Sequence, residues 1–576
     1  MVQHFTKDFK YLEDVEIKTP DKQEILEKAK DIQNAIRQAK TKEEAIQAVK
    51  DYFAFEDDIQ TMASLIYIRH TIDTRDKRYD ELSNLLNEIS PEIDQATNAI
   101  EQDILKSKFK KDLEERFHDL FFRQIELRNK TFSDEIIPDL VEENKLQTEY
   151  VNLISSALIQ YKGKEYSISQ MGKFTSSLNR DERKEASKLV WGFYQKNDEK
   201  IGDIYSRMVQ VRTRIANKLG YKDFVQLGYD RMGRLDWNQE DAKEYREKIL
   251  EYIVPLSEKI KKDQRERIGY GKDHRYYDDV IFYKTGNPTP KGNIQDLVKA
   301  AEKMYRELSP IASHYFDFMV EHHCMDLEAK PGKAGGGYMD YISGLKTAFI
   351  FSNSNGTSGD VDTLTHEFGH ALQGFLGGEE EVPSYRSPGM ECCEMHSMSM
   401  EFITYPWMDY FFKEDADKYK YQHLADAITF IPYGAIVDAF QTYCYQNPTL
   451  THKERKAYWR ELEKQYLPSK DYTGNEFLMS GGYWMRQHHI FENPLYYLDY
   501  TIAQVVALEF FQESREDQKK TFEKYIAFDK LAGTYPFRDL LKKANISNPM
   551  DGDTLKNVSQ SVMQYLSKFD PEKLDK

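Results

Sequence analysis

Residues 361–375 read VDTLTHEFGHALQGF, and this stretch predicts one amphipathic helix with two different faces. At about 100° per residue, a single apolar stripe collects Val361, Leu364, Phe368, Ala371, Leu372 and Phe375. His366 and His370 are four residues apart, so they lie together on another face of the same helix. The helix can therefore pack its apolar stripe into a core while both imidazoles reach one ion.

The order of His366, Glu367 and His370 is the HExxH pattern of a metal-binding helix. Zinc binds imidazole nitrogens at about 2.0–2.1 Å, and a catalytic zinc has three protein ligands with a fourth position left for water. Glu367 lies at the edge of the histidine face, where it can reach that water without binding the ion. The segment predicts one Zn²⁺ per chain, with both histidines as ligands and Glu367 as the general base.

The third ligand has to come from elsewhere in the chain, and two known spacings are excluded. The HExxHxxGxxH pattern fails because Gln373 and Leu376 stand where its glycine and last histidine would be. A glutamate at the thermolysin-type spacing fails because Gly389 and Met390 stand there. The acidic cluster that follows is the remaining source of a ligand.

This cluster, PGMECCEMHSMSMEF at residues 388–402, offers Glu391, Glu394 and Glu401. Glu394 and Glu401 are seven residues apart, so on a helix they point in nearly the same direction. One could bind the metal while the other orients a ligand histidine. The spacing alone leaves the choice among the three glutamates open.

Four other polar residues near the motif receive weaker assignments. Asp362 precedes His366 by four residues, so it could orient an imidazole or stabilise the start of the helix. Cys392 and Cys393 are adjacent and would face different directions on a helix, so we do not expect the pair to bind one ion. We expect His396 to support the site or pack in the core.

The rest of the chain is dominated by helical periodicity. Apolar residues recur at helical steps, and the first 190 residues show no recognisable chemistry. TAFIFS, residues 347–352, has the composition of a strand and follows a glycine-rich stretch. We therefore expect a mainly α fold with a small β-sheet beside the metal helix, in which this strand could pair with an extended substrate.

Composition and charge narrow the function further. The 576 residues include 80 basic and 97 acidic side chains, a formal charge of −17, which argues against nucleic-acid or anionic-membrane partners. No run of 18 apolar residues occurs, and the amino terminus lacks the apolar core of a secretory signal. Four cysteines in this length do not form a disulfide framework. We expect a cytoplasmic protein.

The motifs together resemble the oligoendopeptidase F branch of the thimet oligopeptidase family. The resemblance rests on GTSGDVDTLTHEFGHALQ and ECCEMHSMSMEF around the metal helix, and on GYDRMGRLDW (228–237), GNPTPKG (286–292), TAFIFSNSNGTSGD (347–360) and HHIFENPLYYLDYTIAQ (488–504). It covers most of residues 190–520, with the motifs in the family's order. The amino-terminal region is similar only in being helical.

This resemblance implies a two-lobed helical metallopeptidase around a deep substrate channel. We expect a helical amino-terminal lobe at residues 1–190 and a catalytic region at 191–576. Within that region, the zinc site would span 361–402 and a channel-lining segment 481–512. The resemblance also makes Glu394 the third zinc ligand and Glu401 the residue that supports the ligand histidines.

The family also has a histidine and tyrosines near the carboxyl end that stabilise the tetrahedral intermediate. The matching segment offers His489, Tyr496, Tyr497 and Tyr500, of which we assign His489, Tyr497 and Tyr500 as catalytic. The implied activity is zinc-dependent hydrolysis of internal bonds in short oligopeptides. The alternatives are a zinc carboxypeptidase or peptidyl-dipeptidase, and a peptide-binding protein without turnover.

Overall fold

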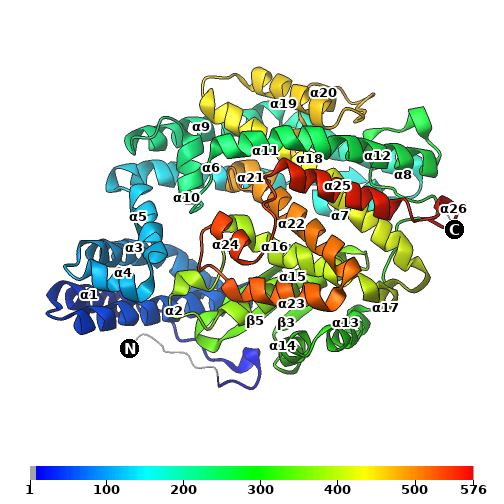
Figure 1. Ribbon diagram of the computed structural model, residues 1–576. Helices are drawn as coiled ribbons and strands as arrows, with labels where there is room; N and C mark the ends of the chain where they lie inside the picture. The colour runs from blue at the N-terminus through cyan, green and yellow to red at the C-terminus, as the bar shows by residue number, and fades with distance from the viewer. Residues whose placement is uncertain (1–7, 575–576) are drawn as a thin grey trace. The chain divides into compact units, whose positions relative to one another are not determined.

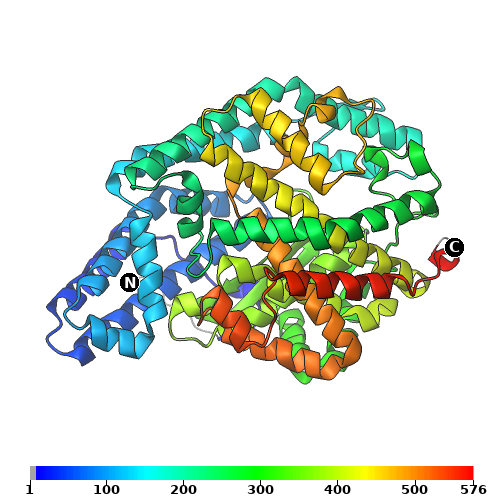
Figure 2. The same ribbon diagram turned by 45° about the horizontal axis from the view of Figure 1, so that its top comes forward.

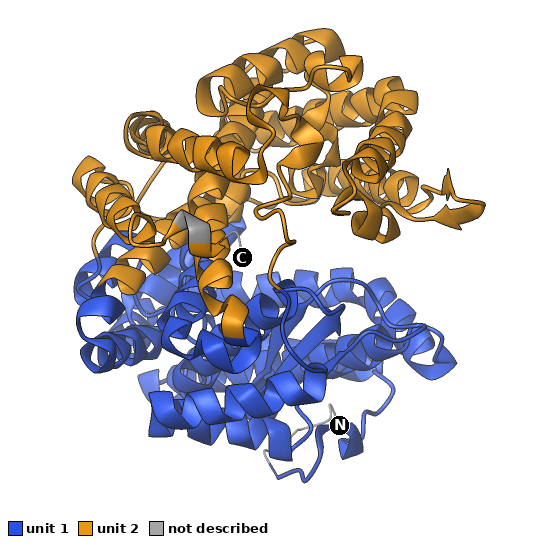
Figure 3. Ribbon diagram, turned by 90° about the vertical axis from the view of Figure 1, so that its right-hand side faces the viewer, with its two compact units in different colours: residues 1–129, 289–413, 513–546 blue, residues 130–288, 414–512, 547–576 orange. Residues whose placement is uncertain are grey.

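The structure is a computed structural model that describes residues 8–574, and α-helices form most of it (Figure 1). The chain divides into two compact units, coloured in Figure 3. Unit 1 comprises the chain up to residue 129 together with 289–413 and 513–546, and unit 2 comprises 130–288, 414–512 and the chain from 547. The predicted mainly α fold with small sheets is confirmed. The division at residue 190 stays a prediction.

Unit 1 contains a helical part and a small mixed sheet. Its helices are α1 (Lys22–Gln38), α2 (Lys42–Ile72), α3 (Lys77–Lys106), α4 (Lys110–Phe117), nearly all of α5 (Asp119–Lys130), α13 (Ile294–Leu308), α14 (Pro310–Glu321), α15 (Gly359–Gly377), α16 (Met390–Ile403), α17 (Met408–Phe412), α23 (Gln518–Leu531) and α24 (Phe537–Lys543). In Figure 1, α15, α16 and α23 lie side by side, and α15 contacts both of the others. These three helices form the framework of the predicted metal site.

The three-stranded sheet lies against α15. Its strands are β3 (Met325–Glu328), β4 (Tyr338–Ile342) and β5 (Thr347–Ser354), in the order β3-β5-β4. β3 runs parallel to β5, and β4 runs antiparallel to it with Tyr338 opposite Phe351 and Ile342 opposite Thr347. Because β5 is the central strand, residues 347–351 are already paired with β4. The expectation that this strand could pair with a substrate is therefore wrong.

The start of α15 is held by a carboxylate in its first turn. Asp360 accepts hydrogen bonds from the Ser354 hydroxyl (2.7 Å) and from the backbone N–H groups of Asn355 (2.9 Å) and Gly356 (2.7 Å). A negative charge at a helix amino terminus is favourable, and here it also fixes the loop from β5. The six residues of the predicted apolar stripe are all buried, so α15 enters the core with the orientation that its sequence predicts.

Unit 2 is also helical and carries a short hairpin. It contains α6 (Ile137–Ser155), β1 (Ile159–Tyr161), β2 (Lys164–Tyr166), α7 (Ile168–Thr175), α8 (Arg180–Lys196), α9 (Asp198–Lys218), α10 (Phe224–Arg231), α11 (Gln239–Tyr252), α12 (Val254–Ile268), α18 (Ala416–Gln446), α19 (His452–Tyr466), α20 (Glu476–Met479), α21 (His488–Glu492), most of α22 (Tyr497–Glu516), α25 (Gly552–Leu566) and α26 (Pro571–Leu574). The yellow helices α18 and α19 lie side by side in Figure 2 and contact each other. No helix among the described residues is long and apolar enough to cross a membrane.

Candidate metal centre

Three side chains from α15 and α16 converge in unit 1. His366 Nε2 lies 3.1 Å from Glu394 Oε2, and His370 Nε2 lies 3.3 Å from the same oxygen. Among the described residues, this is the set of three histidine, cysteine or acidic side chains whose donor atoms lie close enough to share an ion, all within 4.8 Å of one another. Of the three glutamates that the spacing left open, the structure brings Glu394 to the two histidines.

The donor set fits a zinc ion. Two imidazole nitrogens and one carboxylate oxygen form one of the ligand sets of catalytic zinc. Ligands at about 2.0–2.1 Å in tetrahedral geometry are about 3.3–3.4 Å apart. The measured 3.1 and 3.3 Å distances from Glu394 to the two histidines are close to this value. The donor set of His366, His370 and Glu394 therefore fits a zinc ion in its chemistry and in its spacing around Glu394.

Glu401 orients the first histidine. Its Oε1 lies 2.7 Å from His366 Nδ1, on the opposite side of the ring from Nε2. A carboxylate at Nδ1 holds a proton there and leaves Nε2 as the basic nitrogen that faces Glu394. Glu394 and Glu401 thus contact the two nitrogens of the same imidazole, which is the division of roles that the family resemblance implies.

α16 is held close to α15 by a glycine contact and by α23. A methyl group on Gly369 would lie 2.7 Å from Ser397 Cα and 2.8 Å from the His396 carbonyl oxygen, so only glycine fits at this crossing. His396 is buried, and its Nδ1 forms a hydrogen bond to Asp529 of α23. Its carbonyl accepts a hydrogen bond from Tyr525 (2.9 Å). His396 therefore anchors α16 and lies outside the set of candidate ligands.

Burial changes the proton affinity of Glu367. The side chain is 7% exposed, and desolvation raises the pKa of its carboxyl, although His366 and His370 oppose the shift. A base with a raised pKa accepts a proton more readily near neutral pH than an ordinary glutamate does. Glu367 does not belong to the ligand set and is placed beside it.

The candidate ligands are strongly coupled electrostatically. Burial lowers the pKa of His366, but hydrogen bonds to Glu394 and Glu401 outweigh burial and raise that pKa well above its usual value. Burial raises the pKa of Glu394, yet His370 and His366 bring it well below its usual value. Two acidic side chains around this imidazole therefore favour a positive charge here, which a bound divalent cation would supply.

The other polar residues near the motif occupy different positions. Asp362 lies in the first turn of α15, where its charge favours the helix start. Glu391 is buried in the first turn of α16, outside the ligand set. Cys392 is buried and Cys393 is half-buried, and none of the four cysteines forms a disulfide. The role of Asp362 toward an imidazole stays a prediction.

His489, Tyr497 and Tyr500 lie together in unit 2. The ring of His489 is 4.9 Å from that of Tyr497 and 5.6 Å from that of Tyr500, and the two tyrosine rings are 5.6 Å apart. All three side chains are half-buried. Tyr496 packs edge-on against Tyr500, with ring centroids 5.0 Å apart. The three residues assigned from the sequence thus form one aromatic cluster.

Gln487 fixes the tautomer of His489, a feature that the sequence analysis missed. Its Nε2 lies 2.8 Å from His489 Nδ1, and its Oε1 accepts a hydrogen bond from the Tyr433 hydroxyl (2.8 Å). An amide nitrogen can only donate, so Nδ1 accepts and the neutral ring has its proton on Nε2. His489 is therefore a hydrogen-bond donor through Nε2.

Two buried arginines hold the irregular backbone that carries this cluster. Arg212 donates to the carbonyls of Ile490 (3.3 Å) and Phe491 (2.6 Å), and Arg234 donates to that of Leu495 (3.1 Å). Both arginine side chains are fully buried. Arg234 belongs to the GYDRMGRLDW motif, so the motif was a signal for this role, but the contact across 261 residues is a property of the fold.

A helix that presents two histidines and a buried glutamate, with a third carboxylate from the next helix, defines a site of the HExxH class. Two family models match the chain. The peptidase M3 N-terminal domain matches residues 12–132, and peptidase family M3 matches residues 173–559. The chain belongs to peptidase family M3.

Known relatives agree with this assignment. The chain is 24% identical over 303 residues to the oligoendopeptidase F homolog of Borreliella burgdorferi, across 49% of each chain. It is 22% identical over 284 residues to oligopeptidase PepF of Bacillus subtilis, across 47% of this chain and 41% of the relative. The matches thus span about half the length of these relatives or less. The predicted resemblance to oligoendopeptidase F is confirmed.

Solved structures match over nearly the whole chain. PZ peptidase A, solved with an inhibitor, has a TM-score of 0.91 at 42% identity and covers 97% of this chain and 100% of its own. A putative oligoendopeptidase F of Bacillus anthracis has a TM-score of 0.87 at 41% identity, with 98% and 99% coverage. The fold of this chain is therefore that of oligoendopeptidase F structures.

Proposed function

We propose that the protein is a zinc-dependent endopeptidase that hydrolyses internal peptide bonds of short oligopeptides. The observation that carries this proposal is the convergence of His366, His370 and Glu394 with the buried Glu367 beside them. Membership of peptidase family M3 supports the reaction class. The names of the related oligoendopeptidases support oligopeptides as the substrates.

The chain's own residues divide the chemistry among them. When bound, zinc acts as a Lewis acid that activates water and polarises the scissile carbonyl. Glu367 accepts the proton of the attacking water and later passes it to the leaving amine. His366, His370 and Glu394 hold the ion, and Glu401 keeps the His366 ring oriented.

The developing oxyanion needs hydrogen-bond donors, which we assign to the residues that the family resemblance implies. His489 presents an Nε2–H, because Gln487 occupies its Nδ1. Tyr497 and Tyr500 add hydroxyl groups from the start of α22. The pKa of Tyr497 is raised, chiefly by burial, so its hydroxyl keeps its proton at neutral pH. We assign these three residues to transition-state stabilisation.

The test is Glu367→Gln, with Glu379→Gln as the control for an exposed glutamate beyond the end of α15. The first variant should keep its zinc and lose nearly all turnover of an internally quenched peptide, because glutamine cannot accept the water proton. The control should retain both properties. Turnover by Glu367→Gln at the wild-type rate would refute the assigned base.

An exopeptidase is the competing activity for the same site. A carboxypeptidase or peptidyl-dipeptidase needs a free terminal carboxylate, whereas an endopeptidase does not. We therefore expect cleavage of a peptide blocked at both ends. We also propose a cytoplasmic location, which the four cysteines without a disulfide support.

A further inference from the structure

Unit 2 contains a cavity of about 1010 Å³ that the proposed chemistry does not use. Its lining comes from α6, α7, α8, α18 and the segment before α21, and includes Trp191, Tyr194 and Tyr483. Aromatic walls of this kind are typical of ligand pockets, where a few polar groups fix the orientation of the ligand. The ligand that such a cavity can bind depends on which of its polar side chains are not already paired within the protein.

Arg486 is the available cation. Lys470 also lines the cavity, but its ammonium is paired with Asp279 at 2.5 Å. In the part of the chain that the structure describes, no carboxylate oxygen lies within 4.0 Å of the Arg486 guanidinium. Its recorded hydrogen bond is a single one from Nη1 to the Tyr483 hydroxyl (3.3 Å). Most of its five N–H donors can therefore bind a ligand.

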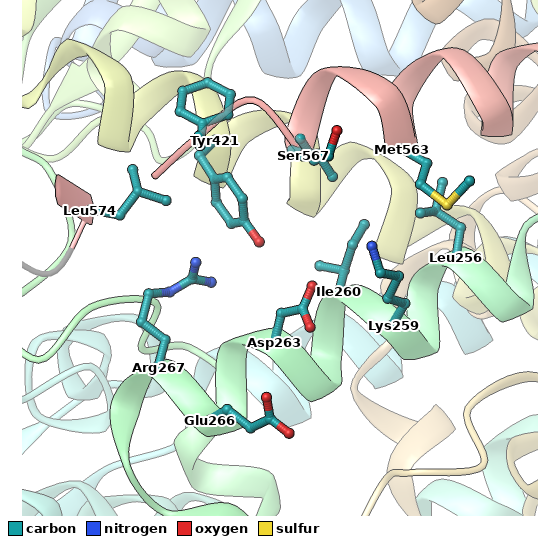
Figure 4. A pocket seen from close by; sticks show the side chains of 12 residues that line it. Leu256, Lys259, Ile260, Asp263, Glu266, Arg267, Tyr421, Met563, Ser567 and Leu574 are labelled. Carbon is teal, nitrogen blue, oxygen red and sulfur yellow. The ribbon is translucent and has the colours of Figure 1, made fainter. Parts of the chain in front are cut away.

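A second pocket of unit 2 also has an arginine in its wall, but that arginine is bound to the protein itself. The cavity of about 450 Å³ in Figure 4 presents Lys259 and Arg267 together with Asp263 and Glu266. The larger cavity has the same balance of charge, because Asp279 and Asp426 line it together with Lys470 and Arg486. In the smaller cavity, Arg267 donates from Nε to the Phe282 carbonyl (3.0 Å) and lies over the ring of Tyr421. Arg267 is therefore part of the packing. Arg486 lies at the wall of the larger cavity, where its guanidinium is 5.4 Å from the Tyr483 ring.

Arg486 and Tyr194 both offer hydrogen-bond donors at the cavity wall. Arg486 is exposed at the cavity wall, and its guanidinium is charged at neutral pH. The Tyr194 hydroxyl has no hydrogen-bond partner among the described residues, and it can donate to the same ligand.

Continuous aromatic contacts connect Arg486 to the proposed catalytic cluster. The ring of Tyr483 is 5.9 Å from that of Tyr433, and Tyr433 is 5.8 Å from Tyr497. Tyr497 in turn contacts His489 at 4.9 Å. A peptide whose scissile bond lies at His489 could therefore extend along these rings and place another part of its chain at Arg486.

We propose that Arg486, with the Tyr194 hydroxyl, is a subsite that binds a carboxylate of the peptide substrate. Guanidinium binds carboxylates through two parallel N–H···O bonds, which gives geometric selectivity as well as attraction. The carboxylate can be the substrate's carboxyl terminus or an acidic side chain. This inference rests on the proposed endopeptidase function and adds a specificity determinant to it.

The test compares four internally quenched peptides of one sequence. One pair has a free or an amidated carboxyl terminus, and the other pair, amidated, carries glutamate or glutamine at one position. Wild type should cleave the charged member of one pair with a kcat/KM about ten- to a hundred-fold higher than that of the neutral member. The pair that shows the difference identifies the source of the carboxylate. Equal rates within both pairs would refute the proposal.

Substitution assigns the preference to Arg486. Arg486→Met should lose the preference, because its kcat/KM for the charged peptide falls toward that for the neutral peptide, and Arg486→Lys should keep part of the preference. Arg123→Met removes one exposed arginine of α5 and is the matched control for net charge, so its preference should be that of wild type. A preference that survives in Arg486→Met, or an equal loss on charged and neutral peptides, would contradict the assignment.

Binding separates failure of this inference from failure of the proposed function. The labelled free-acid and amide peptides can be titrated by fluorescence anisotropy into Glu367→Gln, which should bind without cleavage. Tighter binding of the charged peptide, lost in Glu367→Gln/Arg486→Met, would support the subsite even if wild type showed no peptidase activity. Equal binding of both peptides would refute the subsite even if wild type were active.

Discussion

Gly369 of α15 packs directly on the backbone of Ser397 in α16. A methyl group at Gly369 would lie 2.7 Å from Ser397 Cα, a separation that real Cβ atoms essentially never show. Gly369 precedes His370, and Ser397 follows Glu394 by three residues and donates to its carboxylate (3.1 Å). The helix contact thus sets the distance between two candidate ligands.

We therefore expect Gly369→Ala to weaken zinc binding. The added methyl group has to push α16 away, and overpacking of this kind costs about 1–3 kcal/mol, equivalent to roughly five- to 150-fold in affinity. Competition with a chromophoric chelator measures the effect. Gly192→Ala, in α8 with nothing within 4 Å of the new methyl group, is the control and should bind zinc like wild type. Unchanged affinity in Gly369→Ala would show that the contact does not set the site.

Glu401 should contribute to zinc affinity without binding the ion. Its hydrogen bond to His366 Nδ1 holds the ring in place, and loss of such a partner typically costs about 10–100-fold in metal affinity. Glu401→Ala should show this loss. Glu401→Gln keeps a hydrogen-bond acceptor and should lose less. The same chelator competition provides the measurement, and equal affinities for wild type and Glu401→Ala would contradict the assigned role.

The tyrosines of α22 should affect turnover and leave the metal in place. Tyr497→Phe and Tyr500→Phe each remove one hydroxyl, and loss of one oxyanion donor costs about 10²–10³ in kcat. Zinc content should match that of wild type in both variants. Tyr496→Phe alters a neighbouring tyrosine that packs against Tyr500 and is outside the assigned catalytic set, so it should have a small effect. If Tyr496→Phe were the damaging variant, our assignment would be shifted by one position.

The buried pair of Arg234 and Asp499 should be needed for stability. Arg234 Nη2 lies 2.7 Å from Asp499 Oδ1, and both side chains are fully buried. Arg234→Met leaves a carboxylate buried without its partner, which costs about 3–5 kcal/mol of unfolding free energy. Arg234→Met/Asp499→Leu removes both charges and should recover much of the loss. Urea denaturation measures both variants, and a double variant no more stable than Arg234→Met would contradict this account.

The fold class could be predicted because helical periodicity is a local property. The apolar stripe of α15 is buried along its whole length, as its spacing predicts. Pairing between distant segments could not be predicted in the same way. TAFIFS is recognisable as a strand, but its central position between β3 and β4 depends on residues that no local pattern connects to it. The strand was therefore identified, but its pairing with β3 and β4 was not, and the expected pairing with a substrate was wrong.

The residues of the candidate site also differ in whether local sequence could predict them. His366, Glu367 and His370 share one helix, so their spacing alone brings them together. Glu394 needed the family resemblance, because the spacing could not rank three glutamates. Arg234 and Gln487 act through contacts that only the folded chain creates. Gly369 lies inside the motif, but the need for glycine at this position comes from its contact with the backbone of α16, which the sequence does not show.

The most direct test of the central claim combines elemental analysis with cleavage of a quenched peptide blocked at both ends, before and after chelation. We predict one zinc per chain and cleavage that a chelator abolishes and added zinc restores. A protein without stoichiometric metal, or cleavage that persists after complete metal removal, would contradict the claim that His366, His370 and Glu394 hold a catalytic zinc.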